Sequence, residues 1–330
     1  MASLAAALFE EYSTLNANEI DCATESLGEA LTFDNEIGPD GDPLLGTSGN
    51  DVFFITSSDT RINEAHNGGE DIVVSSASYN LPNHVEHLIL TGSDDLNGSG
   101  NNQDNVIAGN DGNNLLSGGN GNDALVGGNG NDTLDGGNGD DTICAGSGDD
   151  SVIGGNGNDR IITEDGNDTV HAGTGDDAVF GGNNNDLIFG EAGDDSLDGG
   201  EGDDQLFGQT GDDSLTGGGG SDTLSGDKGD DTLIGGAGND SLTGGKGDDF
   251  FSFTDGSGED VIDDFEAGDD VIQLTKDING SGILTGDDVL AGVTEDLSGN
   301  AVVDLGGGNT ITLLGVDKDD LSASDFFIVE

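Results

Sequence analysis

Basic residues are almost missing from this chain of 330 residues. Six Lys and Arg stand against 69 Asp and Glu, which gives a formal net charge of −63. Nucleic-acid binding depends on clustered Lys and Arg that neutralise phosphates, so this deficit excludes nucleic acid as a partner. An anionic membrane surface is disfavoured for the same reason.

Apolar residues are scarce too. Hydrophobic residues make up 32% of the chain and Trp is absent, whereas globular domains usually hold roughly 45–50% apolar residues with Gly included. No run of 18 apolar residues occurs, so the sequence predicts no transmembrane segment. An acidic chain with few aromatics is ordinarily disordered unless cations neutralise its carboxylates.

Cysteine and targeting signals add little. Cys22 and Cys144 lie far apart, without metal-ligand spacing and without an indication of a disulfide framework. The short apolar run in 1–8 has no Lys or Arg before it and is followed by Glu10 and Glu11. We therefore expect no N-terminal signal peptide.

Glycine, by contrast, is abundant, and it recurs with a fixed period. The 153 residues from Gly100 to Ser252 divide into 17 repeats of nine residues without an insertion. Position 8 is apolar in every repeat, and position 6 is Asp in all but the first two, which carry Asn105 and Asn114. Position 4 is Gly in 15 repeats and position 1 in 14. A fixed period of this kind is typical of a solenoid.

The residues of one repeat predict its conformation. Glycines at positions 1, 2 and 4 permit positive φ, so we expect the backbone to curl tightly there. The apolar residue at position 8 predicts a very short, half-buried strand. Two repeats would form one turn of a coil, and stacked turns would form two parallel sheets with position 8 inward.

Stacking repeats n and n+2 would bring the position-6 carboxylates into two ladders. Neighbouring carboxylates repel each other by several kcal/mol at an effective dielectric near 20, so each gap needs a cation. Carboxylates and Gly-rich carbonyls offer only oxygen ligands, which suit Ca²⁺ better than Mg²⁺. Zn²⁺ would favour His or Cys.

The repeats match Gly-Gly-x-Gly-x-Asp-x-U-x, as in Gly118-Gly-Asn-Gly-Asn-Asp-Ala-Leu-Val126, and resemble the nonapeptides of RTX proteins, the hemolysin-type calcium-binding repeats. The resemblance implies an all-β fold, a parallel β-roll (a right-handed β-helix) that binds multiple Ca²⁺ ions. It assigns the ligand role to Asp123, Asp132, Asp141, Asp150, Asp159, Asp168, Asp177, Asp186, Asp195, Asp204, Asp213, Asp222, Asp231, Asp240 and Asp249, and the degenerate repeat that follows adds Asp260. The segments 163–166 and 181–184 depart from the turn pattern, so weaker binding is expected there.

Four segments are expected. Residues 1–45 have leucines at helical spacing and predict a short helical or linker segment. Residues 46–99 form an irregular β lead-in with two isolated repeats and strands near 71–75 and 85–91. Residues 100–252 form the roll, and residues 253–330 form a β-rich cap with a hairpin at 301–316. Within the lead-in, His84 and His87 with Glu86 invite a zinc interpretation, but their spacing favours ordinary surface residues.

The end of the chain, Asp325-Phe-Phe-Ile-Val-Glu330, resembles the uncleaved export signal of RTX proteins, especially serralysin-like proteases. The resemblance thus implies type I secretion machinery as a partner and an extracellular location. At position 9 of the array, Val126, Cys144, Ile162 and Phe180 would align on the outer face of one sheet, and Ile153, Phe189 and Phe207 on the other. These apolar rows could receive a partner or could simply be tolerated exposure.

No motif of an enzyme is found, so we expect no catalytic residues. The favoured interpretation is a secreted calcium-binding RTX protein whose roll folds on binding Ca²⁺ outside the cell and serves a surface, matrix or adhesion role. One alternative is a module that binds extracellular polysaccharide or assists an enzyme. Another is a membrane-active, hemolysin-like protein, although this chain lacks the long apolar segments of the cytolysins.

Overall fold

The computed structural model describes residues 35–37, 43–66 and 68–329. They fall into two compact units, one ending at Asp165 and one beginning at Gly166, which we call the N-terminal and C-terminal units. The predicted N-terminal helix falls in 1–34, outside the described residues. Each unit is a parallel β-solenoid, which confirms the predicted β-roll.

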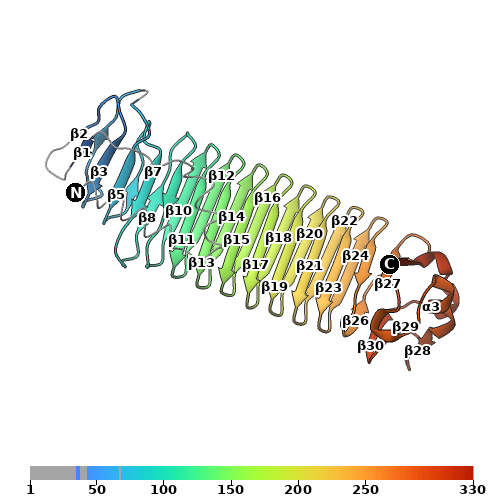
Figure 1. Cartoon of the computed structure of the whole chain (residues 1–330). Coiled ribbons are helices and arrows are strands. Elements are labelled where there is room, and N and C mark those ends of the chain that lie inside the picture. The colour runs from blue at the N-terminus through green and yellow to red at the C-terminus, as the bar shows by residue number, and fades with distance from the viewer. Residues whose placement is uncertain (1–34, 38–42, 67, 330) are drawn as a thin grey trace. The chain divides into compact units, whose positions relative to one another are not determined.

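The strands of the N-terminal unit form two long parallel sheets, β1-β3-β5-β7-β9-β11-β13-β15 and β6-β8-β10-β12-β14, and a small sheet of β2 and β4 (Figure 1). Their bounds are β1 Asn35–Ile37, β2 Leu44–Leu45, β3 Asp51–Ile55, β4 Ile62–Asn63, β5 Ile72–Ser75, β6 Tyr79–Asn80, β7 His87–Leu90, β8 Asn97–Ser99, β9 Val106–Ala108, β10 Leu115–Asn120, β11 Ala124–Asn129, β12 Thr133–Asn138, β13 Thr142–Ser147, β14 Ser151–Asn156 and β15 Arg160–Asp165. The strands predicted near 71–75 and 85–91 are confirmed by β5 and β7.

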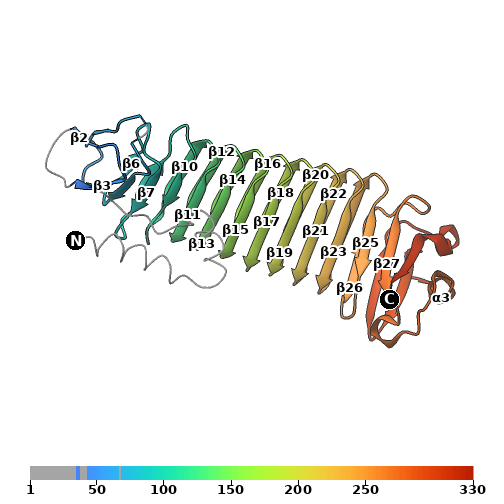
Figure 2. The same ribbon diagram turned by 45° about the horizontal axis from the view of Figure 1, so that its top comes forward.

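The C-terminal unit continues with the same architecture, in the orders β17-β19-β21-β23-β25-β27-β31 and β16-β18-β20-β22-β24-β26-β30-β29-β28. Figure 2 shows β17, β19, β21 and β23 side by side. The bounds are β16 Thr169–Thr174, β17 Ala178–Asn183, β18 Leu187–Ala192, β19 Ser196–Glu201, β20 Gln205–Thr210, β21 Ser214–Gly219, β22 Thr223–Lys228, β23 Thr232–Ala237, β24 Ser241–Lys246, β25 Phe250–Phe253, β26 Glu259–Ile262, β27 Val271–Thr275, β28 Thr294–Glu295, β29 Ala301–Gly306, β30 Asn309–Leu313 and β31 Phe326–Val329.

The cap of the C-terminal unit contains the predicted hairpin, since β29 and β30 pair antiparallel. It also contains the short helix α3 (Gly286–Gly292), whose first turn is capped by the Thr285 side chain accepting from the Asp288 N–H. Strand β31 pairs with β27 in parallel, so Phe326–Val329, part of the segment 325–330 predicted as an export signal, is the edge strand of a sheet in the folded chain.

Each strand from β10 to β24 is longer than predicted. It runs from position 7 of one repeat to position 3 of the next, as in β11, and Leu125 pairs with Ile143 eighteen residues on. Positions 8 and 1 face inward and are buried, as Leu125 and Gly127 show. The core is therefore a column of one apolar side chain per repeat beside a column of glycines.

The position-1 glycines do not have the predicted conformation. Positive φ occurs at positions 2 and 4, as in Gly119 and Gly121, while Gly118 at position 1 has none. Position 1 instead lacks a side chain because it faces inward, against oxygens described below. The prediction of positive φ at position 1 is therefore wrong.

The apolar ladder makes a matched pair of substitutions informative. Leu116 at position 8 is fully buried, whereas its neighbour Leu115 is 48% exposed. We expect Leu116→Ala to lower the free energy of unfolding by about 2–5 kcal/mol, since it leaves a cavity in a packed column. Leu115→Ala should change it by less than about 0.5 kcal/mol. Urea unfolding in saturating CaCl₂ compares them, and equal losses would contradict the inward placement of position 8.

Candidate metal centre

Within each unit, the position-6 aspartates of successive turns form buried ladders. In the N-terminal unit, the Asp123 N–H donates to Asp141 Oδ1 at 2.7 Å, and the Asp141 N–H donates to Asp159 Oδ1 at 2.7 Å. In the C-terminal unit, the Asp186 N–H donates to Asp204 Oδ1 at 2.8 Å. Every one of the sixteen predicted ligands, including Asp260, is at most 3% exposed. The structure thus buries all sixteen predicted ligands, and their role as Ca²⁺ ligands stays a prediction.

The second carboxylate oxygen of these aspartates is buried and accepts no hydrogen bond. This holds for Oδ2 of Asp123, Asp132, Asp141, Asp186, Asp195, Asp204, Asp213, Asp222, Asp231, Asp240 and Asp260. Leaving a buried carboxylate oxygen without a partner costs at least about 1–3 kcal/mol, and more when the group is charged. Repetition of that cost at successive turns indicates a ligand common to all of them.

The glycine at position 1 leaves space beside this oxygen. A β-carbon at Gly136 would lie 2.5 Å from Asp141 Oδ2 and 2.6 Å from the Gly154 carbonyl oxygen of the next turn. At Gly181 the same point lies 2.5 Å from Asp186 Oδ2 and 2.6 Å from the Gly199 carbonyl oxygen. A side chain at position 1 would therefore crowd both oxygens, and glycine lets the Asp carboxylate and the carbonyl of the next turn approach each other.

Burial perturbs the pKa values of these carboxyls strongly. Desolvation, opposed by a backbone hydrogen bond and reinforced by neighbouring carboxylates, raises the pKa of Asp141, Asp186 and Asp222 to about 7. It also raises the pKa to about 7 for Asp260 and to about 6 for Asp123, Asp132, Asp159, Asp195, Asp213, Asp231 and Asp249. The charged ladder is thus unfavourable without a cation.

The donor set fits Ca²⁺. Carboxylate and carbonyl oxygens line the space at each turn, and hard cations with flexible coordination accept such ligands. The buried Oδ2 atoms and the adjacent carbonyls would hold the ion, which would supply the positive charge that the ladder lacks. The same carboxylates orient themselves through the Oδ1 hydrogen bonds to the preceding turn.

Asparagine takes the place of aspartate in the first two repeats. Asn105 Nδ2 donates to the Glu86 carbonyl at 3.1 Å, and Asn114 Nδ2 donates to the Leu96 carbonyl at 2.9 Å. The Oδ1 atom of Asn114 accepts the N–H of Asn110. An amide thus satisfies the carbonyls with a neutral donor, which explains why these repeats do not need an ion.

Three repeats lack the position-1 glycine. Ala145, Thr163 and Ala172 stand there, and all are fully buried. A β-carbon at position 1 points toward the position-6 carboxylate in the repeats that have glycine there, so we expect crowding of the carboxylate in these three repeats. The sequence predicted weaker binding at 163–166 and 181–184, and both stay predictions. For the steric reason above, we expect weaker binding at the repeats of Ala145 and Ala172 too.

A reciprocal pair of substitutions tests this in the C-terminal unit. Gly181→Ala places a β-carbon against Asp186 Oδ2, and Ala172→Gly removes one from the corresponding place. We expect the first to raise and the second to lower the CaCl₂ midpoint of folding, each by up to about tenfold, or about 1.4 kcal/mol. The midpoint is measured by far-UV circular dichroism. Shifts of the same sign in both variants would contradict the account.

The ladder extends beyond the predicted residues. The Asp249 N–H donates to Asp270 Oδ1 at 3.0 Å, and the Asp71 N–H donates to Glu86 Oε2 at 3.0 Å. The sequence marks Asp270 as a candidate ladder residue, because it follows Gly268 in a degenerate repeat. The sequence does not mark Glu86, because its place in the ladder arises from the irregular lead-in.

The histidines of the lead-in correct one expectation. His87 was predicted to lie on the surface, yet it is 9% exposed at the start of β7. Its Nε2 lies 3.5 Å from Glu70 Oε2, and burial lowers its pKa. His84 instead stacks edge-on with His66, with ring centroids 4.9 Å apart. The structure therefore pairs the two histidines with different partners.

Comparison with known families identifies the array. Segments 99–134, 117–152, 145–179, 153–188, 180–215 and 216–251 match the family model of the RTX calcium-binding nonapeptide repeat. Residues 99–251 therefore consist of RTX calcium-binding repeats, and Ca²⁺ is the ion that they bind.

Two individual proteins share part of this sequence or fold. The endo-1,3-1,4-beta-glycanase EglC of Rhizobium meliloti (strain 1021) is 35% identical over 65 residues, which is 20% of this chain and 14% of the glycanase. The extracellular lipase LipA of Serratia marcescens is 18% identical, with a TM-score of 0.31 over 78% of this chain and 45% of the lipase. This chain thus spans less than half of either protein, and the second likeness carries no argument about function.

Among the described residues, none of the helices is long and apolar enough to cross a membrane.

Proposed function

We propose that this protein is a secreted calcium-binding protein whose solenoid folds when Ca²⁺ fills the aspartate ladders outside the cell. The observation that carries the proposal is the row of buried Asp Oδ2 atoms without hydrogen-bond partners. Where Ca²⁺ is scarce, burying this many carboxylates is unfavourable, so the chain would stay unfolded and fit for export. Where Ca²⁺ is abundant, its binding free energy becomes folding free energy.

The proposal includes export by type I secretion machinery and a surface, matrix or adhesion role rather than catalysis. Proteins with RTX repeats are typically secreted. Extracellular Ca²⁺ modules bind Ca²⁺ with Kd values of about 10⁻⁴–10⁻³ M. Sites with such Kd values would stay empty at the low Ca²⁺ concentration inside a cell and fill at the higher concentration outside. The secretion machinery would recognise the segment 325–330 before β31 forms.

Circular dichroism tests the proposal directly. In EDTA we expect the spectrum of an unfolded chain, and CaCl₂ at millimolar concentration should produce a cooperative change to β structure. Equal MgCl₂ should produce little change, because Mg²⁺ requires a tighter octahedron and keeps its waters. A β spectrum in EDTA that CaCl₂ leaves unchanged would refute ion-driven folding.

A second candidate function is binding of extracellular polysaccharide. The observation that favours it is an aromatic row on one outer face of the C-terminal unit, where the rings of His171 and Phe189 stack at 4.8 Å and those of Phe189 and Phe207 at 5.1 Å. Retention of the Ca²⁺-loaded chain on immobilised polysaccharide, lost in Phe189→Ala, would favour this role. Leakage of liposomes with added CaCl₂ would instead favour the membrane-active alternative.

A further inference from the structure

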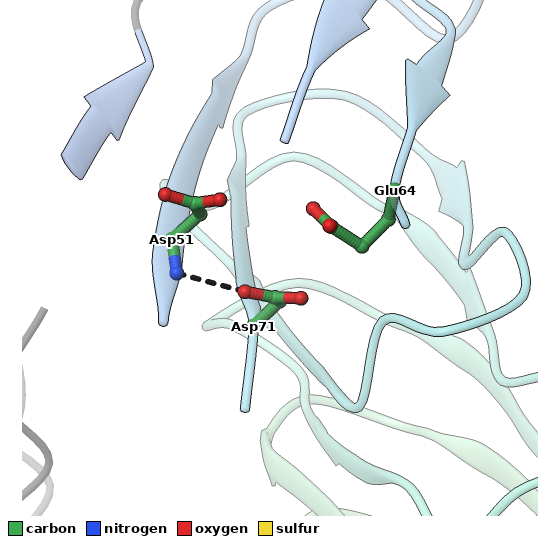
Figure 3. A group of neighbouring side chains, drawn as sticks. All are labelled: Asp51, Glu64 and Asp71. Atoms are coloured by element: carbon green, nitrogen blue, oxygen red, sulfur yellow. Dashed lines mark hydrogen bonds between the residues drawn. The ribbon is translucent and has the colours of Figure 1, made fainter. Parts of the chain in front are cut away.

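Three carboxylates meet in the lead-in of the N-terminal unit, outside the nonapeptide array. Oxygen atoms of Asp51, Glu64 and Asp71 all lie within 4.8 Å of one another. Figure 3 shows the Glu64 carboxylate turned toward the space beside the two aspartates. The three side chains come from separate parts of the chain, so the cluster is built by tertiary structure.

Two of these carboxylates belong to the ladder. Asp51 begins β3 and Asp71 directly precedes β5, the neighbouring parallel strand. The Asp51 N–H donates to Asp71 Oδ1 at 2.8 Å, which is the same hydrogen bond that links successive aspartates of the array. This pair is therefore an early turn of the ladder, with the partners 20 positions apart in the sequence.

Glu64 has no counterpart in the repeat. It directly follows β4, which pairs with β2 in the small separate sheet. A β-carbon at Gly46 would clash with Glu64 Oε2, so the Glu64 carboxylate fills the space beside Gly46. In the array, the corresponding space is bounded by an Asp oxygen and a backbone carbonyl of the next turn. Here a third negative charge takes part.

The cluster contains oxygens that have no hydrogen-bond partner. Asp71 is fully buried, and its Oδ2 accepts no hydrogen bond. Glu64 Oε2 is buried and also accepts none, whereas Oε1 accepts from the Ala65 N–H at 2.6 Å. Like charges at this separation repel each other strongly when buried. A bound cation would relieve both the repulsion and the missing contacts.

We propose that Asp51, Glu64 and Asp71 bind one Ca²⁺ ion outside the regular array, with Glu64 as a ligand that no repeat supplies. The all-oxygen donor set suits a hard divalent cation, and flexible coordination accommodates ligands from three separate segments. The ion fastens the β2–β4 sheet to the first turns of the ladder. The site rests on the proposed function through the ladder residues Asp51 and Asp71, and it goes beyond that function through Glu64, which lies outside every repeat.

Substitution of Glu64 distinguishes an ion site from a merely acidic cluster. Glu64→Gln keeps the Oε1 acceptor for Ala65 but removes one charge. If a Ca²⁺ ion is bound, the variant loses a charged ligand and its local affinity falls by about tenfold or more. If no ion is bound, the variant only relieves repulsion, and the lead-in becomes more stable. The two accounts predict opposite signs.

Hydrogen-exchange mass spectrometry of the full chain reads this region separately. Protection of peptides from 44–66 is followed against CaCl₂ at pH 8, above the usual titration range of histidine. Peptides from 196–216, within the array, serve as the internal reference. The matched control is Asp59→Asn, which removes an exposed charge from the same segment.

We expect Glu64→Gln to raise the CaCl₂ midpoint of protection in 44–66 by about tenfold, with the midpoint in 196–216 unchanged. Asp59→Asn should leave both midpoints unchanged. An unchanged or lowered midpoint in 44–66 for Glu64→Gln overturns the proposed site, while array peptides that still respond to CaCl₂ leave the proposed function intact. Array peptides that ignore CaCl₂ would refute the proposed function instead.

Discussion

Replacing Asp186, Asp204 and Asp222 by asparagine should make the chain less dependent on Ca²⁺ for folding. These three residues are consecutive in one ladder of the C-terminal unit, and each N–H of one donates to Oδ1 of the next. Asparagine keeps the Oδ1 acceptor and removes buried charge. Its Nδ2 can donate to the neighbouring carbonyls, as Asn105 and Asn114 do in the natural sequence.

Two measurements test this prediction. In EDTA, circular dichroism should show more β structure for the triple variant than for the natural chain. Equilibrium dialysis with ⁴⁵Ca²⁺ should show fewer ions bound per chain. Each removed carboxylate relieves repulsion on the order of a few kcal/mol, so the effect should be large.

The control removes the same charge from the surface. Asp194, Asp212 and Asp230 are exposed and form their own ladder, in which the Asp212 N–H donates to Asp194 Oδ1 at 2.9 Å. Asparagine at these positions keeps the acceptor and leaves the buried oxygens untouched. If this control gained β structure in EDTA as much as the buried triple variant, net charge alone would explain the effect, and the ladder would not be the ion site.

Acid should partly substitute for Ca²⁺. Burial raises the pKa of the ladder carboxyls from the model-compound value of 3.8 to about 6 in Asp195 and about 7 in Asp222. Without an ion, the folded chain therefore binds protons more tightly than the unfolded chain. The resulting stabilisation is complete below about pH 3.8 and is lost as the pH rises through about 6 to 7.

Circular dichroism in EDTA at pH 5.5 and pH 8 measures this effect. Both values lie above the sequence pI of about 4.1, so the chain keeps its net negative charge. We expect more β structure at pH 5.5. In CaCl₂ the direction reverses, because protons compete with the ion for carboxylates, and the midpoint should rise by about tenfold or more at pH 5.5. More β structure at pH 8 in EDTA would contradict the pKa argument.

The sequence predicted the period, the inward position 8 and the pairing of repeats n and n+2, because one apolar residue and one Asp recur every nine residues. It predicted the wrong role for Gly118 and its equivalents. Glycine serves two purposes here, positive φ at positions 2 and 4 and free space at position 1, and the residue type alone does not distinguish them. Only the inward direction of position 1 in the strand reveals the second purpose.

Residues outside the nine-residue period were harder to predict from the sequence. Glu86 joins the ladder by a hydrogen bond, and Glu64 lies beside the ladder residues Asp51 and Asp71. Both arrive there through tertiary contacts of an irregular segment, and neither lies at a repeat position. The helix α3 spans seven residues, which is too short for an apolar period to mark it. Outside the array, the strands β5 and β7 and the hairpin of β29 and β30 could still be predicted from local pattern, whereas contacts between distant segments could not.

A crystal structure grown in CaCl₂, with anomalous differences recorded at long wavelength, tests the central claim most directly. The account predicts anomalous peaks beside Oδ2 of ladder aspartates such as Asp141, Asp186 and Asp222, next to the position-1 glycines. It predicts no peak beside Asn105 or Asn114, where amide nitrogens take the place of the ion. Peaks confined to exposed carboxylates such as Asp194 and Asp212, at position 5 of their repeats, would contradict it. The absence of any peak along the ladders would contradict it too.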